Sequence, residues 1–320
     1  AEHRQYLNTF VQTRWYISDL IASIGLNFNT TNYDLEDRFP DANDFSGDYS
    51  FDPVLSPFLT LHYEPDWFRG NTIFAVASHG FAPPTLEETL TPDGNINPDI
   101  QPEQGWNFEV GSRGQLDWLT YNFSIYSMQI KDLLVARRTA ADQFIGINAG
   151  RTVHNGIEFA LSSSHSINSQ LQIFPFLNYA YSDYKFDEFL DGEKDFSGNE
   201  LTGTAPHIAS AGIRFTALDN NAIYGNINYQ FVDAMPLRDD NSVYSNAYNL
   251  VNLKLGYRLD LSRNWQLDFF GGINNLFDEQ YASMLLINAG SFGGNAPRYY
   301  YPGLPRNFYG GINVRYQITH

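Results

Sequence analysis

Apolar and polar residues alternate strictly along residues 251–275, and this pattern constrains the fold more than any other feature of the chain. The apolar positions are Val251, Leu253, Leu255, Tyr257, Leu259 and Leu261, followed after a Ser-Arg-Asn turn by Trp265, Leu267, Phe269 and Ile273. A period of two indicates β-strands, because successive side chains leave opposite faces of the backbone. A soluble β-sandwich would bury the apolar face against a second sheet. A membrane β-barrel would turn that face toward lipid and line its lumen with the polar one.

Comparable segments recur along the whole chain. The pattern predicts about thirteen strands, at 4–17, 19–30, 54–64, 71–80, 104–115, 118–130, 152–164, 169–183, 206–217, 221–231, 247–260, 264–275 and 307–318. Most hold about ten residues, whereas five or six are usual in globular sheets. About ten residues are what a tilted strand needs to cross a bilayer. Pro175 lies inside one strand, where it removes a ladder donor and predicts a bulge or local irregularity.

The connections between these strands alternate between short and long. The short ones are 18–19, 64–70, 114–118, 164–169, 217–221 and 261–264, and the long ones are 31–53, 80–103, 131–151, 184–205, 232–246 and 276–306. A sandwich has no reason to gather every long connection at one end. An outer-membrane barrel has one, since its short turns face the periplasm and its long loops face outward. The sequence therefore predicts an all-β fold, a transmembrane antiparallel β-barrel.

Composition and charge agree with this prediction. The long connections hold 25 of the 36 acidic and 10 of the 19 basic residues, so they carry −15 of the net charge of −17. Such acidity argues against a nucleic-acid partner. The absence of cysteine excludes a disulfide framework and thiol chemistry. No run of about 18 apolar residues exists, so no transmembrane helix is expected. The aromatic share of 16% suits the girdles of a barrel.

Five phrases, spread in order over residues 80–317, resemble the C-terminal half of TonB-dependent outer-membrane receptors. They are GFAPPTLEE (80–88) with NINPDIQPEQGWNFEVGSRG (95–114), NGIEFAL (155–161), APHIASAGIRF (205–215), GGINNLFDEQY (271–281) and YYYPGLPRNFYGGINVRYQ (299–317). Two departures stand out. Ala82 replaces the arginine of the family's FRAP phrase, and residues after Tyr316 do not end on an aromatic side chain.

The resemblance implies a partial barrel. Receptors of this family resemble 22-stranded barrels with a plug, whereas about thirteen strands are present here, an odd number. We therefore expect residues 1–320 to form the C-terminal part of such a barrel, with the plug domain, the TonB box and the early strands absent. Open sheet edges are not tolerated in lipid. The missing N-terminal part of the barrel, from the same or a second chain, is thus an expected partner.

The resemblance also implies a function. It predicts an active-transport receptor in the Gram-negative outer membrane that binds a ferric siderophore or similar metal chelate at its external loops. The TonB complex would supply energy through the plug, and outer-membrane lipid and lipopolysaccharide would surround the barrel. Alternatives are a cobalamin or other small-nutrient receptor of the same family, and a passive porin. An enzyme is not expected, because no histidine has a recognisable serine or aspartate context.

Candidate ligand contacts lie in the predicted external loops. Tyrosines can stack on the rings of a siderophore, and arginines can pair with its carboxylates. These candidates are Arg137, Arg138, Phe292, Arg298, Tyr299, Tyr300, Tyr301 and Arg306. An aromatic girdle at the outer interface is the competing interpretation of the tyrosine run. The adjacent pair Arg137 and Arg138 also suits lipopolysaccharide phosphates.

Charged residues on the polar strand faces form a second set. They are expected to face the lumen or the plug, where paired charges cost less than in lipid: Glu109, Arg113, Glu158, Arg214, Lys254, Arg258 and Arg315. No cofactor is expected to be required. The acidic loops 34–52 and 187–195, with Asp41, Asn43 and Asp44, suggest a bound Ca²⁺, although neither matches an EF-hand loop. A solvated acidic surface is the alternative.

Overall fold

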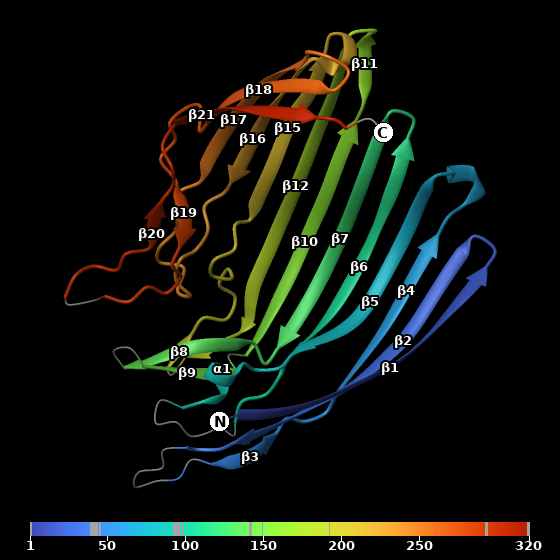
Figure 1. Cartoon of the computed structure of the whole chain (residues 1–320). Coiled ribbons are helices and arrows are strands. Elements are labelled where there is room, and N and C mark those ends of the chain that lie inside the picture. Colours follow the sequence, from blue (N-terminus) through green and yellow to red (C-terminus); the bar gives the residue numbers. More distant parts are fainter. Residues whose placement is uncertain are drawn as a thin grey trace. The chain divides into compact units, whose positions relative to one another are not determined.

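The computed structural model describes residues 2–38, 44, 46–91, 97, 99–140, 143–148, 150–191, 193–291 and 294–318. Its main sheet follows the order of the chain (Figure 1). The strands along that path are β1 (Glu2–Ile17), β2 (Leu20–Leu35), β4 (Val54–Tyr63), β5 (Asn71–Ala82), β6 (Glu103–Leu116), β7 (Leu119–Lys131), β10 (Arg151–Ser163), β12 (Leu171–Glu188), β15 (His207–Ala217), β16 (Ile223–Val232), β17 (Tyr248–Asp260), β18 (Trp265–Asn274) and β21 (Asn307–Tyr316). Each corresponds to one of the predicted strands, so the all-β prediction is confirmed.

Short elements lie in the connections. They are β3 (Gly47–Ser50), the pair β8 (Leu134–Ala140) and β9 (Gln143–Asn148), β11 (His165–Asn168), the pair β13 (Leu190–Asp191) and β14 (Lys194–Asp195), the pair β19 (Ala282–Leu285) and β20 (Tyr300–Pro302), and the helical turns η1 (Asp66–Phe68), α1 (Leu86–Thr89) and η2 (Asp219–Asn221). Within the described residues, no helix is both long and apolar enough to span a lipid bilayer.

The strand order is linear, with β1 at one end and β21 at the other. Among the described residues these two strands are not paired with each other. A linear strand order without a closing pair is consistent with the expected partial barrel.

The chain divides into two compact units. The first comprises Ala1–Gly111, Ile125–Asn155 and Tyr184–Asn199, and the second comprises Ser112–Ser124, Gly156–Asp183 and Glu200–His320. In the first unit, β1 and β2 pair without interruption from Glu2↔Leu35 to Ile17↔Leu20. Its small core lies at the loop end of β2, where Tyr33 packs against Phe51 and Ile100 from the following connections. Burying apolar groups at the loops rather than along the strands leaves the long strand faces open.

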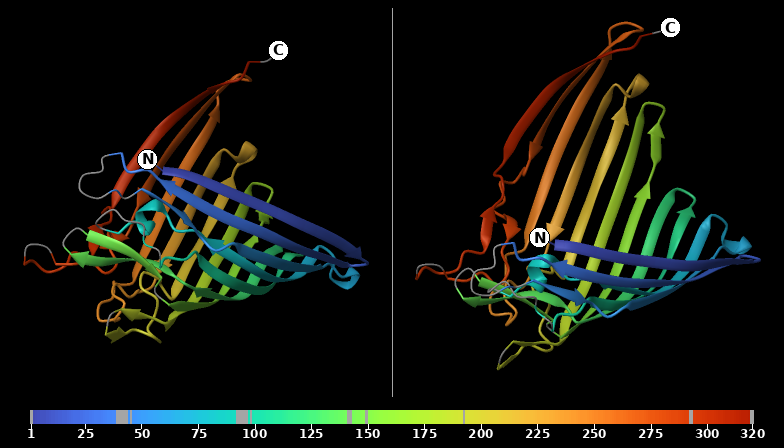
Figure 2. Two further views of the ribbon diagram at one scale, coloured as in Figure 1. Left: turned by 90° about the horizontal axis from the view of Figure 1, so that it is seen from below. Right: turned by 60° about the horizontal axis from the view of Figure 1, so that its bottom comes forward.

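The second unit holds an antiparallel meander of β12, β15, β16, β17, β18 and β21, and Figure 2 shows its last four strands side by side in both views. Its hairpin turns 218–222 and 261–264 lie at one end of the strands, and its long connections lie at the other end (Figure 1). The one-sided arrangement of loops is thus confirmed within this unit. Pro175 pairs with Ile213 without a register shift between β12 and β15, so the irregularity expected there is absent from this pairing.

The two faces of this meander differ as the alternation predicts. Leu255 is 58% exposed and Ile312 is 62% exposed, although both are large and apolar. A sandwich would bury this row against a second sheet, so exposure of the row excludes that alternative for these strands. The register places charged residues on the opposite face, where Arg258 lies across from Asp268 and Arg315 across from Gln266.

Aromatic rings cover glycines on the polar face. A Cβ at Gly256 would lie 2.2 Å from Cζ of Tyr224, and one at Gly311 would lie 2.6 Å from Cζ of Phe270. Both pairs join neighbouring strands: Tyr224 pairs with Gly256, and Phe270 with Gly311. Glycine is required at these positions because the ring occupies the space of a side chain, and the ring shields the strand in return.

Candidate functional site

The connection 232–246 of the second unit folds tightly around Leu237, whose side chain is not exposed at all. The backbone N–H of Leu237 donates to the carbonyl of Val243 over 2.8 Å, and that of Ser245 donates to the carbonyl of Met235 over 2.9 Å. A bridge between Pro236 and Tyr244 completes this small hairpin. Buried apolar packing and paired backbone groups make the connection an ordered structure.

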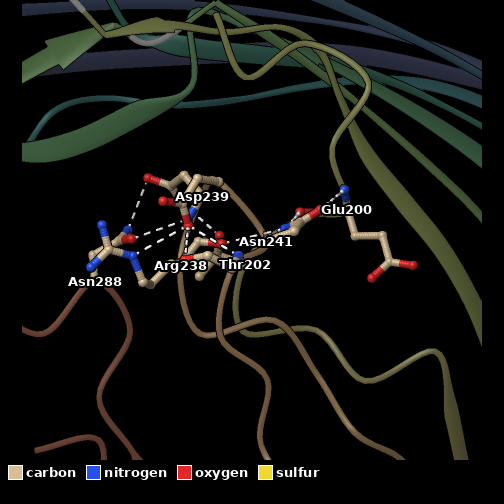
Figure 3. A network of polar contacts seen from close by, with 8 residues as sticks. Glu200, Thr202, Arg238, Asp239, Asn241 and Asn288 are labelled. Carbon is tan, nitrogen blue, oxygen red and sulfur yellow. Dashed lines mark hydrogen bonds and ion pairs between the residues drawn. The ribbon is translucent and has the colours of Figure 1, made fainter. Parts of the chain in front are cut away.

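Asp239 joins this connection to two others (Figure 3). Its carboxylate accepts from the Thr202 hydroxyl over 2.5 Å and from the Asn288 amide over 2.9 Å. Its backbone N–H donates to the Asn288 side-chain oxygen over 3.2 Å. Hydrogen bonds to a charged group are worth about 1.5–3 kcal/mol each. Asp239 therefore fastens residues 200–203, 233–245 and 282–302 together, and we call these segments the three-loop assembly.

Other contacts support the same assembly. The Asn241 side chain accepts from the backbone N–H of Glu200 over 2.8 Å and donates to its carbonyl over 3.0 Å (Figure 3). The backbone N–H of Gly203 donates to the carbonyl of Pro236, and that of Asn288 donates to the carbonyl of Leu237, both over 2.8 Å. Backbone and side-chain bonds thus connect all three segments.

Arg238 is held in place from two sides. Its Nε donates to the Asp240 carboxylate over 3.2 Å, and its side chain also hydrogen-bonds Tyr299. Both bonds raise the pKa of the Arg238 guanidinium, and the bond with Tyr299 has the larger effect. The Ser242 hydroxyl donates a hydrogen bond to the Asp240 carboxylate over 2.6 Å, and this bond is the main cause of the lowered pKa of Asp240. Arg238 and Tyr299 therefore act as supports within the assembly.

The tyrosines beside Tyr299 are differently placed. Tyr299 is only 9% exposed, whereas Tyr300 is 51% and Tyr301 is 50% exposed. Strand β20 carries the exposed pair and pairs with β19, so that Met284 lies across from Tyr301. Tyr300 also lies 3.5 Å from the carbonyl of Tyr244, measured from its hydroxyl. The assembly thus presents two accessible tyrosine rings on an ordered hairpin.

The remaining predicted ligand residues have varied positions. Arg298 and Arg306 are exposed, and the backbone N–H of Arg306 donates to Asp278 over 2.7 Å. Phe292 lies outside the described residues. Arg137 and Arg138 lie on β8, which pairs with β9 in the first unit.

The sequence did not indicate Asp239, Thr202 or Asn288 as site residues. They are separated by 37 and 49 residues along the chain, and no local pattern marks them.

The charged residues predicted for the lumen lie on the polar strand faces. In β6, Glu109 and Arg113 alternate with the exposed apolar residues Trp106, Phe108 and Val110. Glu158 lines a cavity of about 250 Å³ together with Asn122, Asn178 and Ser210. The other four members of the set lie on the same face of β15, β17 and β21, by the register of the second unit.

Among the residues that are described, the acidic loops 34–52 and 187–195 form no cluster of side chains that could coordinate Ca²⁺. Asp41 and Asn43 fall outside those residues, and Asp44 accepts from the backbone N–H of Ser46 over 2.9 Å. Nowhere in the described part of the chain do three or more histidine, aspartate or glutamate side chains come together as a metal site would require.

Comparison with known proteins gives two curated relatives, one of which is described here, and many similar structures. The vitamin B12 transporter BtuB of Photobacterium profundum is 26% identical over 224 residues, which are 68% of this chain and 33% of that protein. The copper transporter OprC has a TM-score of 0.72 at 18% identity, with 98% of this chain and 49% of OprC covered. The ferric citrate transporter FecA has a TM-score of 0.74 at 17% identity, with 98% and 45% covered.

These likenesses concern only part of each longer protein. The chain spans a third of BtuB and about half of OprC and of FecA. At such identities the solved structures show a shared fold. The model of the β-barrel of TonB-dependent receptor-like proteins matches residues 1–276, most of the chain. The chain therefore belongs to the TonB-dependent receptor-like β-barrel family.

Proposed function

We propose that the chain is the C-terminal part of the barrel of an outer-membrane active-transport receptor. The receptor binds a ferric siderophore or a similar metal chelate at its external loops and imports it with energy from the TonB complex. The observation that carries this proposal is the three-loop assembly, an ordered structure at the long-loop end that exposes Tyr300 and Tyr301. Family membership supports it, as does the similarity to transporters of copper and ferric citrate.

The chemistry of the exposed groups suits such a cargo. Tyrosine rings offer flat faces to the aromatic or planar parts of a chelator, and Arg298 and Arg306 offer charge to its anionic groups. A rigid assembly loses little conformational entropy when it binds, which raises the affinity for a given set of contacts. The hydrogen bonds of Asp239 and Arg238 supply that rigidity.

Cobalamin is the second candidate cargo, because one curated relative is a vitamin B12 transporter. The exposed apolar positions of the assembly, among them Met284 and Ile287, would contact a large, weakly charged ligand of this kind. In the same proposal, Arg137 and Arg138 bind anionic groups of lipopolysaccharide or of the cargo.

Uptake by the complete gene product tests the proposal. Cells that express it as their sole receptor should accumulate radiolabelled iron from one class of ferric chelate, or labelled cyanocobalamin, only when TonB is present. Replacement of Tyr300 and Tyr301 by alanine should weaken binding about tenfold, since a stacked ring contributes about 1 kcal/mol or more. Tyr16→Ala is the matched control, because Tyr16 is also an exposed tyrosine but lies beside the short turn 18–19. Equal uptake with and without TonB would indicate a passive porin.

A further inference from the structure

A pocket of about 450 Å³ lies on the apolar face of the second unit. Its walls come from three neighbouring strands: Ile223 of β16, Leu255 and Tyr257 of β17, and Phe269 of β18. Gly271 lies at the floor, and no ring covers it, because the nearest atom to an added Cβ is 3.5 Å away. Among the lining side chains, Tyr257 alone carries a polar atom. The pocket therefore favours a hydrocarbon ligand.

The pocket lies at a defined depth from the short-turn end of the strands. Trp265 begins β18 directly after the turn 261–264, and Phe269 and Gly271 follow four and six residues later. A strand rises about 3.3 Å per residue and tilts by about 40° in a barrel, so these two residues lie about 10–15 Å deeper than Trp265. Half of the hydrocarbon core is about 15 Å thick. The pocket is therefore level with the middle and the end of an acyl chain in the leaflet at the short-turn end.

An aromatic pair marks the boundary of that leaflet. Trp265 lies across from Tyr316 in the register of β18 and β21, and the two ring centres are 4.7 Å apart. Trp265 is 46% and Tyr316 is 54% exposed. Tryptophan and tyrosine rings of this kind lie at the headgroup level of a membrane. The headgroup of a lipid whose chain fills the pocket would thus lie beside the turn 261–264.

That turn carries a cation without a counter-charge. Arg263 is exposed, and among the described residues it takes part in no ion pair. The nearest acidic residue in the sequence, Asp260, accepts from the Gln266 amide over 2.9 Å instead. The turn itself is ordered: the Asn264 amide donates to the carbonyl of Gln317, and the backbone N–H of Gln317 donates to the carbonyl of Asn264, both over 2.8 Å. Because arginine binds phosphate through two parallel N–H···O bonds, Arg263 is available to a phosphate at this level.

We propose that the pocket and the turn 261–264 together bind one molecule of an anionic glycerophospholipid, phosphatidylglycerol. Its phosphate pairs with Arg263, its glycerol region lies against Trp265 and Tyr316, and one acyl chain fills the pocket above Gly271. The opposite charges of guanidinium and phosphate favour this occupant over a purely apolar one. The short turns face the periplasm, so the lipid belongs to the periplasmic leaflet and is not lipopolysaccharide.

This site differs from the general contact of a barrel with lipid. Elsewhere a chain meets an open strand face, whereas here a recess holds the chain and a cation holds the headgroup at a matching distance. The inference rests on the barrel architecture, with the apolar face toward lipid and the short turns toward the periplasm. It is independent of the cargo.

Native mass spectrometry of the complete gene product in detergent tests this inference. The protein is mixed with equal amounts of phosphatidylglycerol and phosphatidylethanolamine of the same chain length, and the bound lipids are identified and counted. We expect one phosphatidylglycerol per protein, retained about fivefold more often than phosphatidylethanolamine, which is the gain from one basic residue beside an anionic lipid. A phosphatidylglycerol with a diazirine near the end of its acyl chain should label β17 or β18 on irradiation.

Two variants separate the headgroup contact from the chain contact. Arg263→Gln should remove the preference for phosphatidylglycerol, while one lipid of either kind is still retained. Gly271→Leu places a side chain at the floor of the pocket, so it should lower the retention of both lipids and abolish the labelling of β17 and β18.

Each variant has a matched control. Arg69→Gln should leave the preference unchanged, because Arg69 is also an exposed arginine of a short turn but pairs with Asp66 over 3.4 Å. Ala211→Leu should leave retention unchanged, because Ala211 lies across from Tyr229 on the apolar face but outside the pocket. Heat-modifiable migration in a gel verifies that each variant is folded.

Four results would overturn the inference: no stoichiometric lipid on the unmodified protein, equal retention of the two lipids, labelling confined to other strands, or a dimer that Gly271→Leu dissociates. The last result would identify a second copy of the chain as the occupant. Cargo uptake is measured separately in cells. Normal uptake without a selective lipid refutes the lipid site alone, and a selective lipid on a protein that imports no cargo refutes the transport proposal alone.

Discussion

A side chain at position 256 would collide with the ring of Tyr224, and this collision has a calculable cost. A Cβ at Gly256 would lie 2.2 Å from Cζ of that ring, whereas ordinary contacts begin near 3.4 Å. The ring must therefore move by more than about 1 Å. Its hydroxyl is bonded to Asp268 over 2.8 Å, and Arg258 is stacked on its face, so this movement breaks both contacts.

The magnitude follows from the interactions lost. A hydrogen bond to a charged group contributes about 1.5–3 kcal/mol, and the exposed cation–π contact contributes about 0.5–1 kcal/mol. Replacing glycine by alanine restrains the unfolded chain, which recovers about 0.4–1 kcal/mol. We expect Gly256→Ala to lower the free energy of unfolding by about 1–3.5 kcal/mol.

Urea unfolding of the complete protein in detergent micelles, followed by tryptophan fluorescence, measures this change. Gly271→Ala is the control, because Gly271 lies on the neighbouring strand, where the nearest atom to a new Cβ is 3.5 Å away. Its effect should stay within about 0.5 kcal/mol. Combining Gly256→Ala with Tyr224→Leu should cost less than the two single changes together. The reasoning fails if Gly256→Ala unfolds at the same urea concentration as Gly271→Ala, or if the double variant is simply additive.

Three further outcomes are expected. Asn275→Leu removes the side-chain bonds to Glu279 and to the carbonyl of Leu304, and it places a bulky residue at φ 52°. The free energy of unfolding should therefore fall by about 2–4 kcal/mol. An unchanged unfolding midpoint would contradict this expectation. Asp239→Ala should speed hydrogen exchange in residues 282–302 while Arg263→Ala leaves it unchanged, because Asp239, unlike Arg263, bonds to Asn288 in that segment. Equal protection in both variants would refute the fastening role. The pKa of Asp240 is lowered, mainly by the hydrogen bond from the Ser242 hydroxyl, so its carboxylate stabilises the assembly fully above the ordinary pKa of 3.8. This stabilisation disappears as the pH falls through the lower pKa of the folded state, and limited proteolysis should then cleave the connection 232–246 only at the acid end of the range. Asp240→Asn should remove this pH dependence.

The long strands were predictable because their signal is local. Alternation such as that of Leu253, Leu255 and Tyr257 is present in the sequence itself, and the structure places these residues in β17. Asn275 and Asp278 lie in the phrase GGINNLFDEQY (271–281), and both bond backbone groups at the base of the last long connection. Boundaries differed by a few residues at most strand ends, for example at β12, which continues to Glu188.

The loops were not predictable in the same way. The pairs β8–β9 and β19–β20 lie inside long connections, where no strand was predicted, and β19–β20 pairs residues fifteen or more positions apart. Tyr299 is buried beside Arg238, and its predicted contact with a ligand stays a prediction. Whether a tyrosine in a run of three is buried depends on partners from another connection, and one sequence contains no signal for that choice. The ligand roles of Tyr300 and Tyr301 stay predictions.

The last long connection begins and ends at one clasp. Asn275 holds the carbonyl of Leu304, and Asp278 holds the backbone N–H of Arg306. The two ends of the loop are therefore positioned by residues that belong to its base, whatever lies between them. Because the entropy of closing a loop rises by only about 0.6 kcal/mol for each doubling of its length, residues 280–303 are interchangeable with segments of other lengths. A segment of another length can thus be joined at this clasp while β18 and β21, the two strands that it connects, stay unchanged.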